Sequence, residues 1–122
     1  MSKVVILEKD FDLADNIKEI LSYKDYEVCS IGSGINSKAL VNRFAPSFVI
    51  LGTRLNGGKD GIETARDIRK DYSCPLLFLS TNENSESMKK MIKRIPNSFI
   101  LQKPFSIKSL HLAVDRALSP KM

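Results

Sequence analysis

Polar side chains that can hold ions or donate hydrogen bonds follow four short apolar runs of the chain, at the point where each run ends. Carboxylates bind hard cations such as Mg²⁺, whereas ammonium groups, hydroxyls and backbone amides bind oxyanions. The sequence shows no Ser-His-acid arrangement, metal-ligand cluster or Gly-rich phosphate loop, so we do not expect an enzyme. The segments that carry the polar side chains are Glu8-Lys9-Asp10, Gly52-Thr53, Ser80-Thr81 and Lys103-Pro104-Phe105.

The apolar runs have the length of buried strands and alternate with segments of helical period. The strand-like runs span residues 4–7, 48–51, 76–79 and 99–101, with a weaker one at 26–31. The helix-like apolar stripes span residues 13–21, 40–44, 62–68, 88–95 and 107–117. Continuous apolar strands separated by helices predict an α/β protein with a parallel sheet covered on both faces. In such a sheet the functional crevice lies outside the carboxyl ends of the strands, where the four polar segments begin.

Three of the predicted helices begin with a residue that can accept hydrogen bonds from the first free amides. Asp10 or Asp12 can cap the helix at 13–21, and Ser106 can cap the helix at 107–117. Asp60 can cap the helix at 62–68, with Glu63 placed to reach back as in a capping box. These caps fix where the loops that follow the first, third and fifth strands end.

Three motifs in one register carry a family resemblance. They are Lys103-Pro104-Phe105 after the last strand, Ser80 at the end of the strand before it, and Asp60-Gly61-Ile62-Glu63 at the third helix. With the order of the elements, they resemble the response-regulator receiver domain over nearly all 122 residues. The resemblance implies a doubly wound five-stranded parallel sheet, the (βα)5 flavodoxin-like fold, with strand order 2-1-3-4-5. We expect one domain over residues 1–122, with 119–122 as a tail.

The resemblance implies a phosphorylation pocket built from four kinds of residue. In the family, two acids after the first strand hold Mg²⁺, and an aspartate that ends the third strand accepts the phosphoryl group. A hydroxyl after the fourth strand and a lysine after the fifth contact the phosphoryl oxygens. This chemistry needs hard oxygen ligands, a carboxylate nucleophile and compensating positive charge. Here Glu8 matches the first acid, Ser80 the hydroxyl and Lys103 the lysine.

Two positions of this pocket depart from the family. Gly52 stands at the phosphoacceptor and Lys9 at the second acid; glycine has no nucleophile, and an ammonium cannot ligate a metal. A shift of one residue brings Leu51 or Thr53 to the phosphoacceptor position, and neither is an acid. Lys9 either replaces the metal between its acidic neighbours or extends into solvent. We predict a degenerate pocket without phosphoacceptor, metal or cofactor, made of Glu8, Lys9, Asp10, Gly52, Thr53, Ser80 and Lys103.

These departures favour a pseudo-receiver, an atypical receiver domain of two-component or phosphorelay signal transduction that acts by phosphorylation-independent protein binding. The resemblance implies a kinase, an output domain or a second copy as partner, bound through helix 88–95, strand 99–101 and helix 107–117. The basic residues of that surface are Lys89, Lys90, Lys93, Lys108 and His111. The family's aromatic switch position falls on Ile100, with Phe99 one residue earlier. The alternative is a small-anion or ligand-sensing domain that uses the basic pocket.

The composition limits the other classes of partner. The net charge is +5, and such a basic excess can indicate nucleic acid or an acidic membrane surface. However, the chain has no Trp and no interleaving of aromatic and basic residues that would stack bases, so we do not predict nucleic-acid binding. No apolar run approaches the ~18 residues that span a bilayer, and the N-terminus does not resemble a secretory signal. We therefore expect a cytoplasmic domain that binds no membrane, with Cys29 and Cys74 as buried thiols.

Overall fold

Strands and helices alternate along the whole chain. The computed structural model describes residues 2–32, 37–55, 60–81 and 86–119. Its strands are β1 (Lys3–Leu7), β2 (Glu27–Ile31), β3 (Phe48–Gly52), β4 (Leu76–Ser80) and β5 (Ser98–Gln102). Its helices are α1 (Phe11–Ser22), α2 (Ser37–Phe44), α3 (Gly61–Asp71), α4 (Glu86–Lys93) and α5 (Ile107–Leu118). The five predicted strand–helix units are confirmed, including the weakest strand.

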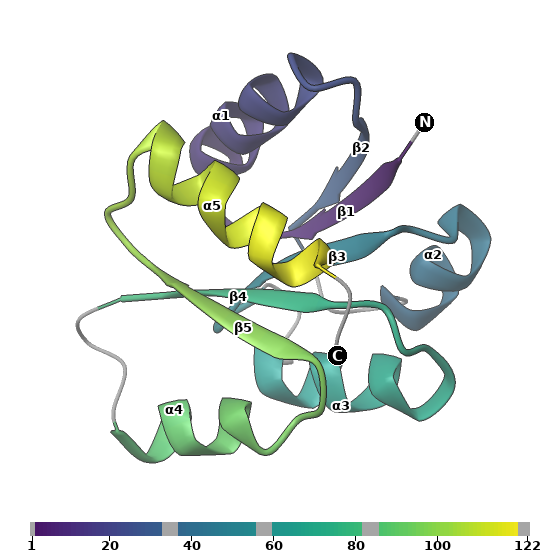
Figure 1. Cartoon of the computed structure of the whole chain (residues 1–122). Helices are drawn as coiled ribbons and strands as arrows, with labels where there is room; N and C mark the ends of the chain where they lie inside the picture. The colour runs from purple at the N-terminus through teal and green to yellow at the C-terminus, as the bar shows by residue number, and fades with distance from the viewer. Residues whose placement is uncertain (1, 33–36, 56–59, 82–85, 120–122) are drawn as a thin grey trace.

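The strands form one parallel sheet in the order β2-β1-β3-β4-β5, which confirms the predicted topology (Figure 1). Leu7 of β1 pairs in register with Leu51 of β3, and Ser80 of β4 pairs with Gln102 of β5. The carboxyl ends of these four strands are therefore level. From β1 the chain continues to β2 at one edge of the sheet and then crosses back to β3, which lies on the other side of β1. The carboxyl ends of β1 and β3 are therefore the topological switch point.

Helices cover both faces of the sheet, as expected for a doubly wound fold (Figure 1). On one face, the strands pack against α2, α3 and α4 through buried side chains such as Val41, Ile68 and Ile92. On the other face, they pack against α1 and α5 through Ile17 and Leu110 among others. All residues of β3 and β4 are buried, which explains their continuous apolar sequence.

The predicted caps fix the loops that surround the carboxyl ends of the strands. Asp10 rather than Asp12 caps α1, because the Oδ1 atom of Asp10 accepts from the backbone N–H of Leu13 at 3.2 Å. Asp60 caps α3 in the same way, accepting from the backbone N–H of Glu63 at 2.7 Å. Ser106 caps α5. Satisfying these otherwise unpaired amides stabilises each helix start by ~0.5–2 kcal/mol.

Several details of the sequence prediction need correction. Ile95 lies beyond the end of α4, although it is buried, and Met91 is 36% exposed rather than part of the core. Ile107 is 60% exposed because it is the first residue of α5 and its side chain precedes the packed turns. Cys29 and Cys74 are free thiols that are half-buried rather than fully buried. Helix α5 ends at Leu118, and residues 120–122 of the predicted tail lie outside the described residues.

Candidate functional site

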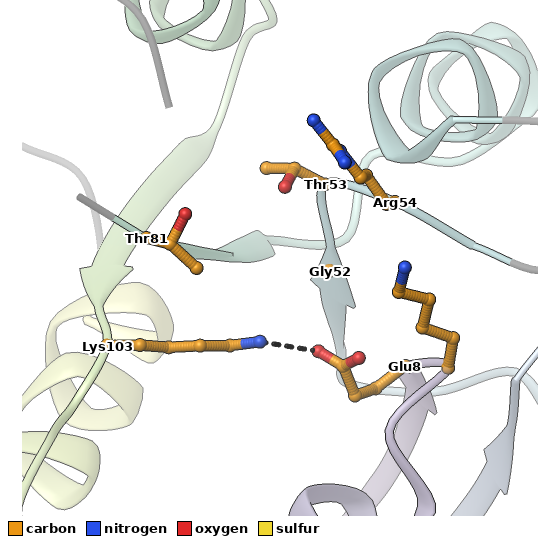
Figure 2. Close-up of a pocket in the computed structure, with 7 residues that line it drawn as sticks. Glu8, Gly52, Thr53, Arg54, Thr81 and Lys103 are labelled. Carbon is orange, nitrogen blue, oxygen red and sulfur yellow. Dashed lines mark hydrogen bonds and ion pairs between the residues drawn. The ribbon is translucent and has the colours of Figure 1, made fainter. Parts of the chain in front are cut away.

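A pocket of about 180 Å³ opens at the carboxyl ends of the central strands (Figure 2). Its lining comes from the loops after β1, β3, β4 and β5, so it lies at the topological switch point. Of the residues predicted for the degenerate pocket, the structure brings Glu8, Lys9, Gly52, Thr53 and Lys103 together here. The remaining lining residues are Arg54 and Thr81.

A partly buried ion pair crosses this pocket from the residue after β1 to the residue after β5. The Nζ atom of Lys103 lies 3.1 Å from Oε1 of Glu8, whose side chain is only 3% exposed (Figure 2). The other oxygen, Oε2, accepts from the backbone N–H of Asp10 at 3.0 Å. The backbone N–H of Lys103 donates to the carbonyl of Ser80 at 2.7 Å, which fixes the point from which the lysine reaches across. Both oxygens of the buried carboxylate are thus paired, as a buried charge requires.

Gly52 ends β3 directly beside that carboxylate. A Cβ atom built on Gly52 would lie 2.8 Å from Oε1 and 3.3 Å from Cδ of Glu8. Both distances are shorter than ordinary van der Waals contact, so the carboxylate of Glu8 occupies the space into which a side chain at position 52 would project. Glu8 therefore fills the space beside Gly52 and next to Lys103.

The backbone of the loop after β3 is held close to the start of α3. The N–H of Gly61 donates to the carbonyl of Thr53 at 2.9 Å, and Arg54 forms an isolated bridge with Asp60. A Cβ atom on Gly61 would lie 1.9 Å from the carbonyl oxygen of Gly52, so this approach requires a glycine. The contact fixes the position of Arg54, which follows the strand by two residues.

Lys9 does not bridge two acids, which answers the question that the sequence left open. The carboxylate of Asp10 is turned toward the first turn of α1, and the carboxylate of Glu8 is taken by Lys103. Lys9 is exposed and makes no ion pair with either acid within the described residues. Its ammonium lines the pocket instead of replacing a metal at its centre. The interpretation of Lys9 as a metal substitute between Glu8 and Asp10 is therefore wrong.

The hydroxyl groups are also placed differently from the prediction. Ser80 is fully buried beneath the pocket and does not line it, and its Oγ has no hydrogen-bond partner in the part of the chain that the structure describes. Thr53, which is 7% exposed, and Thr81 supply the hydroxyls that line the pocket. Sequence reasoning named Thr81 beside Ser80 at a strand end but did not include it in the predicted pocket, and it missed Arg54, whose only signal was its place two residues beyond β3.

The charges of the lining favour an anion over a metal ion. Lys9, Arg54 and Lys103 face a single carboxylate, that of Glu8, so the lining carries an excess of positive charge. Mg²⁺ prefers several hard oxygen ligands, whereas the one carboxylate here is already bound by an ammonium and an amide. This donor set does not fit Mg²⁺. Across the described ranges, no group of three or more His, Cys, Asp or Glu side chains could hold a metal ion.

The predicted switch residues lie on opposite faces of the edge strand β5. Phe99 packs with the cluster that includes α1 and α5, whereas Ile100 packs with the cluster that includes α2, α3 and α4. Helices α4 and α5 flank this strand on the two faces of the sheet (Figure 1). The basic residues predicted for a partner surface are divided between them: Lys89, Lys90 and Lys93 on α4, and Lys108 and His111 on α5. Lys89 is paired with Glu86 at 3.8 Å, and His111 is half-buried.

Comparison with known proteins agrees with this geometry. The response regulator receiver domain family matches residues 4–115. The receiver domain of NtrX from Brucella abortus is 27% identical, with a TM-score of 0.84 over 94% of this chain and 97% of that chain. In a structure of NtrX from Brucella abortus in complex with ATP, the identity is again 27% and the TM-score 0.85, over 96% of this chain. This chain spans only 27% of that longer one.

A further solved structure shares the fold at lower identity. Chemotaxis protein CheY4 from Vibrio cholerae is 23% identical, with a TM-score of 0.87 over 97% of this chain and 99% of that chain. None of the helices within the described residues is both long enough and apolar enough to cross a membrane. The family match covers residues 4–115, and the strand order β2-β1-β3-β4-β5 is the one that the family resemblance predicted. The chain therefore belongs to the response regulator receiver domain family.

Proposed function

We propose that this receiver domain is a pseudo-receiver, which accepts no phosphoryl group at the usual position and signals through phosphorylation-independent protein contacts. The observation that carries the proposal is the environment of Gly52. No carboxylate ends β3, and the space beside Gly52 is filled by the carboxylate of Glu8, which is already paired with Lys103. A phosphoryl group would find neither a nucleophile at position 52 nor a lysine free to bind its oxygens.

The donor set around the pocket supports the same conclusion. Phosphoryl transfer in this family needs a divalent cation, and the single paired carboxylate of Glu8 does not fit Mg²⁺. Lys9, at the position of the second acid, adds positive charge to the same pocket. The proposal therefore assigns the domain no enzymatic activity, metal or cofactor.

Receiver domains interact with other signalling proteins such as kinases and output domains. For this chain we propose a kinase, an output domain or a second copy as partner, bound through α4, β5 and α5. Support comes from the exposed side chains of Lys90 and Lys93 on α4 and of Lys108 on α5, which flank the edge strand. Leu112, four residues after Lys108 on α5, is 58% exposed. Exposed cations suit an acidic partner surface.

A second candidate function is the sensing of a small oxyanion. The observation that favours it is the composition of the pocket, in which Lys9, Arg54 and Lys103 outnumber the carboxylate of Glu8. Hydroxyls of Thr53 and Thr81 also line the space. Phosphate or sulfate matches this chemistry, because cations and hydroxyl donors together bind tetrahedral oxyanions.

The test of the leading proposal is incubation with acetyl phosphate, and separately with beryllofluoride, in the presence of Mg²⁺. We expect the intact mass to stay unchanged with acetyl phosphate and the amide spectrum to stay unchanged with beryllofluoride. A stoichiometric increase by one phosphoryl group would overturn the proposal, and the hydroxyl of Thr53 would then be the first residue to examine. A Mg²⁺ titration of the same protein should show no saturable site in the millimolar range.

A designed variant supplies the positive control for that test. Lys9→Asp combined with Gly52→Asp restores the acids of an ordinary receiver beside Glu8, and we expect it to regain saturable Mg²⁺ binding. If the double variant does not bind Mg²⁺, the assignment of these three residues to one pocket is wrong.

The second candidate function is tested by titrating the unmodified protein with sulfate and following the amide spectrum. Saturable amide shifts confined to the pocket residues support oxyanion sensing, and their absence rejects it.

A further inference from the structure

A second pocket, of about 260 Å³, lies between α3 and the turn that joins α4 to β5. Its lining consists of Arg66, Arg69, Lys70, Arg94, Ile95 and Pro96. The turn runs directly into the amino end of β5, whereas the degenerate pocket lies at the carboxyl ends of the strands. The two pockets therefore lie at opposite ends of the strands, and Figure 1 shows α3 beside the start of β5. We call the second pocket the arginine groove.

The arginine groove gathers four cations and no carboxylate. Lys70 has a partner, because its Nζ lies 3.5 Å from Oδ1 of Asp67. Arg66 and Arg94 are both exposed, and neither makes an ion pair or side-chain hydrogen bond with another described residue. Guanidinium groups gathered without a counter-ion repel one another, so the free domain gains nothing from this arrangement, whereas a bound anion would relieve it.

Arg69 is held rigidly at the floor of the arginine groove. Its Nη1 donates to the carbonyl of Tyr72 at 2.7 Å, and its Nη2 donates to the carbonyl of Asn97 at 3.4 Å. Asn97 is itself fixed, because its Nδ2 donates to the carbonyl of Ser73 at 2.9 Å. The guanidinium therefore joins the end of α3 to the turn before β5. A side chain ordered in this way loses little further entropy when it binds a ligand.

The two hydrogen bonds to carbonyls do not use all of the hydrogen-bonding groups of Arg69. Its Nε is buried and has no hydrogen-bond partner among the described residues, which is unusual for a charged side chain. Burial lowers the pKa of Arg69 from its usual value, because removal from water disfavours the charged form. A structural tie between α3 and β5 accounts for the two bonds to carbonyls. It does not account for Arg66 and Arg94, which are exposed beside it.

We propose that the arginine groove binds an acidic segment of a partner protein, with one carboxylate on Arg69 and neighbouring acids on Arg66 and Arg94. Guanidinium groups favour this chemistry because their planar donors match a carboxylate with two bonds. The apolar residues Ile95 and Pro96 form the wall that a peptide side chain packs against. No aromatic side chain lines the groove, so the bases of a nucleic acid would have no stacking surface.

The first measurement compares two double variants with the same change in net charge. Fluorescein-labelled oligo-glutamate is titrated with the full chain and followed by anisotropy at physiological ionic strength. Arg66→Glu with Arg94→Glu should weaken binding roughly tenfold, since each reverses one contact in the groove. Lys18→Glu with Lys24→Glu changes one exposed residue on α1 and one in the turn that follows it, and α1 packs on the other face of the sheet; this pair should weaken binding by less than about threefold. Equal weakening by the two pairs would overturn the proposal, because only net charge would then matter.

The second measurement locates the peptide on the protein. The side-chain Nε–H resonance of Arg69 should shift and saturate as unlabelled oligo-glutamate is added to the ¹⁵N-labelled domain. An unmoved Arg69 resonance at saturation would overturn the proposal. A short oligothymidylate serves as the competing probe. If it binds more tightly than the peptide and loses affinity for the groove variant to the same extent, the groove is assigned to nucleic acid and the acidic peptide is rejected.

These results are independent of the proposed pseudo-receiver function. Phosphorylation of the unmodified domain would reject that function and leave the arginine groove untouched. The groove variants should also fold normally, since Arg66 and Arg94 are exposed and support no described side-chain contact. Their melting temperature should equal or exceed that of the unmodified domain because repulsion in the groove is removed. A clear decrease would instead assign these arginines a structural role.

Discussion

The carboxylate of Glu8 lies against Gly52 and 3.1 Å from the ammonium of Lys103, so the first acid of the pocket is paired with its last lysine. In an ordinary receiver, these groups act on a metal and a phosphoryl group respectively. Here they neutralise each other across the end of β3. This pairing bears on the stability of the domain, because Glu8 is 3% exposed and depends on its partner.

Two glycines near the pocket should respond very differently to alanine. At Gly52 a Cβ meets the far end of the Glu8 side chain at 2.8 Å, and that carboxylate can move by a few tenths of an ångström. At Gly61 a Cβ meets the backbone oxygen of Gly52 at 1.9 Å, and backbone cannot move without disturbing β3. We expect Gly52→Ala to cost about 1 kcal/mol and Gly61→Ala about 3 kcal/mol or more in urea unfolding. Similar costs for both would contradict the close approach of α3 to β3.

The ion pair between Glu8 and Lys103 should contribute more stability than an exposed pair. Lys103→Met leaves the buried carboxylate of Glu8 with only the amide of Asp10, and we expect a loss of ~2–3 kcal/mol, since the lysine side chain is 26% exposed. Adding Glu8→Gln should recover part of that loss, because the unpaired charge is then removed. The matched control is Lys38→Met, which breaks the exposed pair with Asp71 and should cost clearly less. If chemical denaturation shows that Lys103→Met and Lys38→Met lose the same free energy of unfolding, Glu8 is better solvated than its burial indicates.

Lys9 should matter for anions and not for the fold. Because it is exposed and unpaired with Glu8 or Asp10, Lys9→Ala should change the free energy of unfolding by less than about 0.5 kcal/mol. The same variant should weaken binding of sulfate to the pocket, whereas Lys9→Arg should retain it. A loss of stability well above 1 kcal/mol would revive the interpretation that Lys9 replaces a metal.

The stability of the domain should fall at alkaline pH in part because of Cys74. Burial raises the pKa of the Cys74 thiol above its usual value of 9.0, despite the opposing effect of Arg69. Above pH 9.0 the unfolded chain releases this proton while the folded domain retains it. The folded state then binds more protons, so the free energy of unfolding decreases as pH rises from 9.0 toward the folded pKa.

Cys74→Ala should remove that part of the pH dependence, and Cys29→Ala is the matched control. The comparison is made by urea unfolding at a series of pH values. In Cys74→Ala a smaller decrease in the free energy of unfolding should persist above pH 10.0 because of Tyr26. Burial first, and then the charge of Asp115, raise the pKa of Tyr26 above its usual value of 10.0. If the free energy of unfolding changes equally between pH 9 and 10 in both variants, the folded state does not hold the proton of the Cys74 thiol more tightly than the unfolded chain does.

The sequence by itself determined the order of the elements and the residue types at the ends of the strands. Apolar runs such as 48–51 and 76–79 are local signals, and caps such as Asp60 and Ser106 act within one turn of a helix, so neither depends on the rest of the fold. The absence of an acid at Gly52 and the cation at Lys9 are also properties of single positions. The fold could therefore be predicted from the sequence, and the residue types at positions 9 and 52 are known without the fold.

Only the tertiary structure decided which groups meet. Glu8 and Lys103 are 95 residues apart in the chain, and the pairing of Glu8 with Lys103 rather than Lys9 depends on the direction in which each side chain leaves its loop. Burial placed Ser80 beneath the pocket and left Arg54 and Thr81 to line it. The arginine groove likewise joins α3 to the turn before β5, and Arg69 reaches Asn97 across 28 residues. Periodicity reports which side of a strand or helix is buried, whereas long-range pairing depends on how the packed elements bring distant loops together.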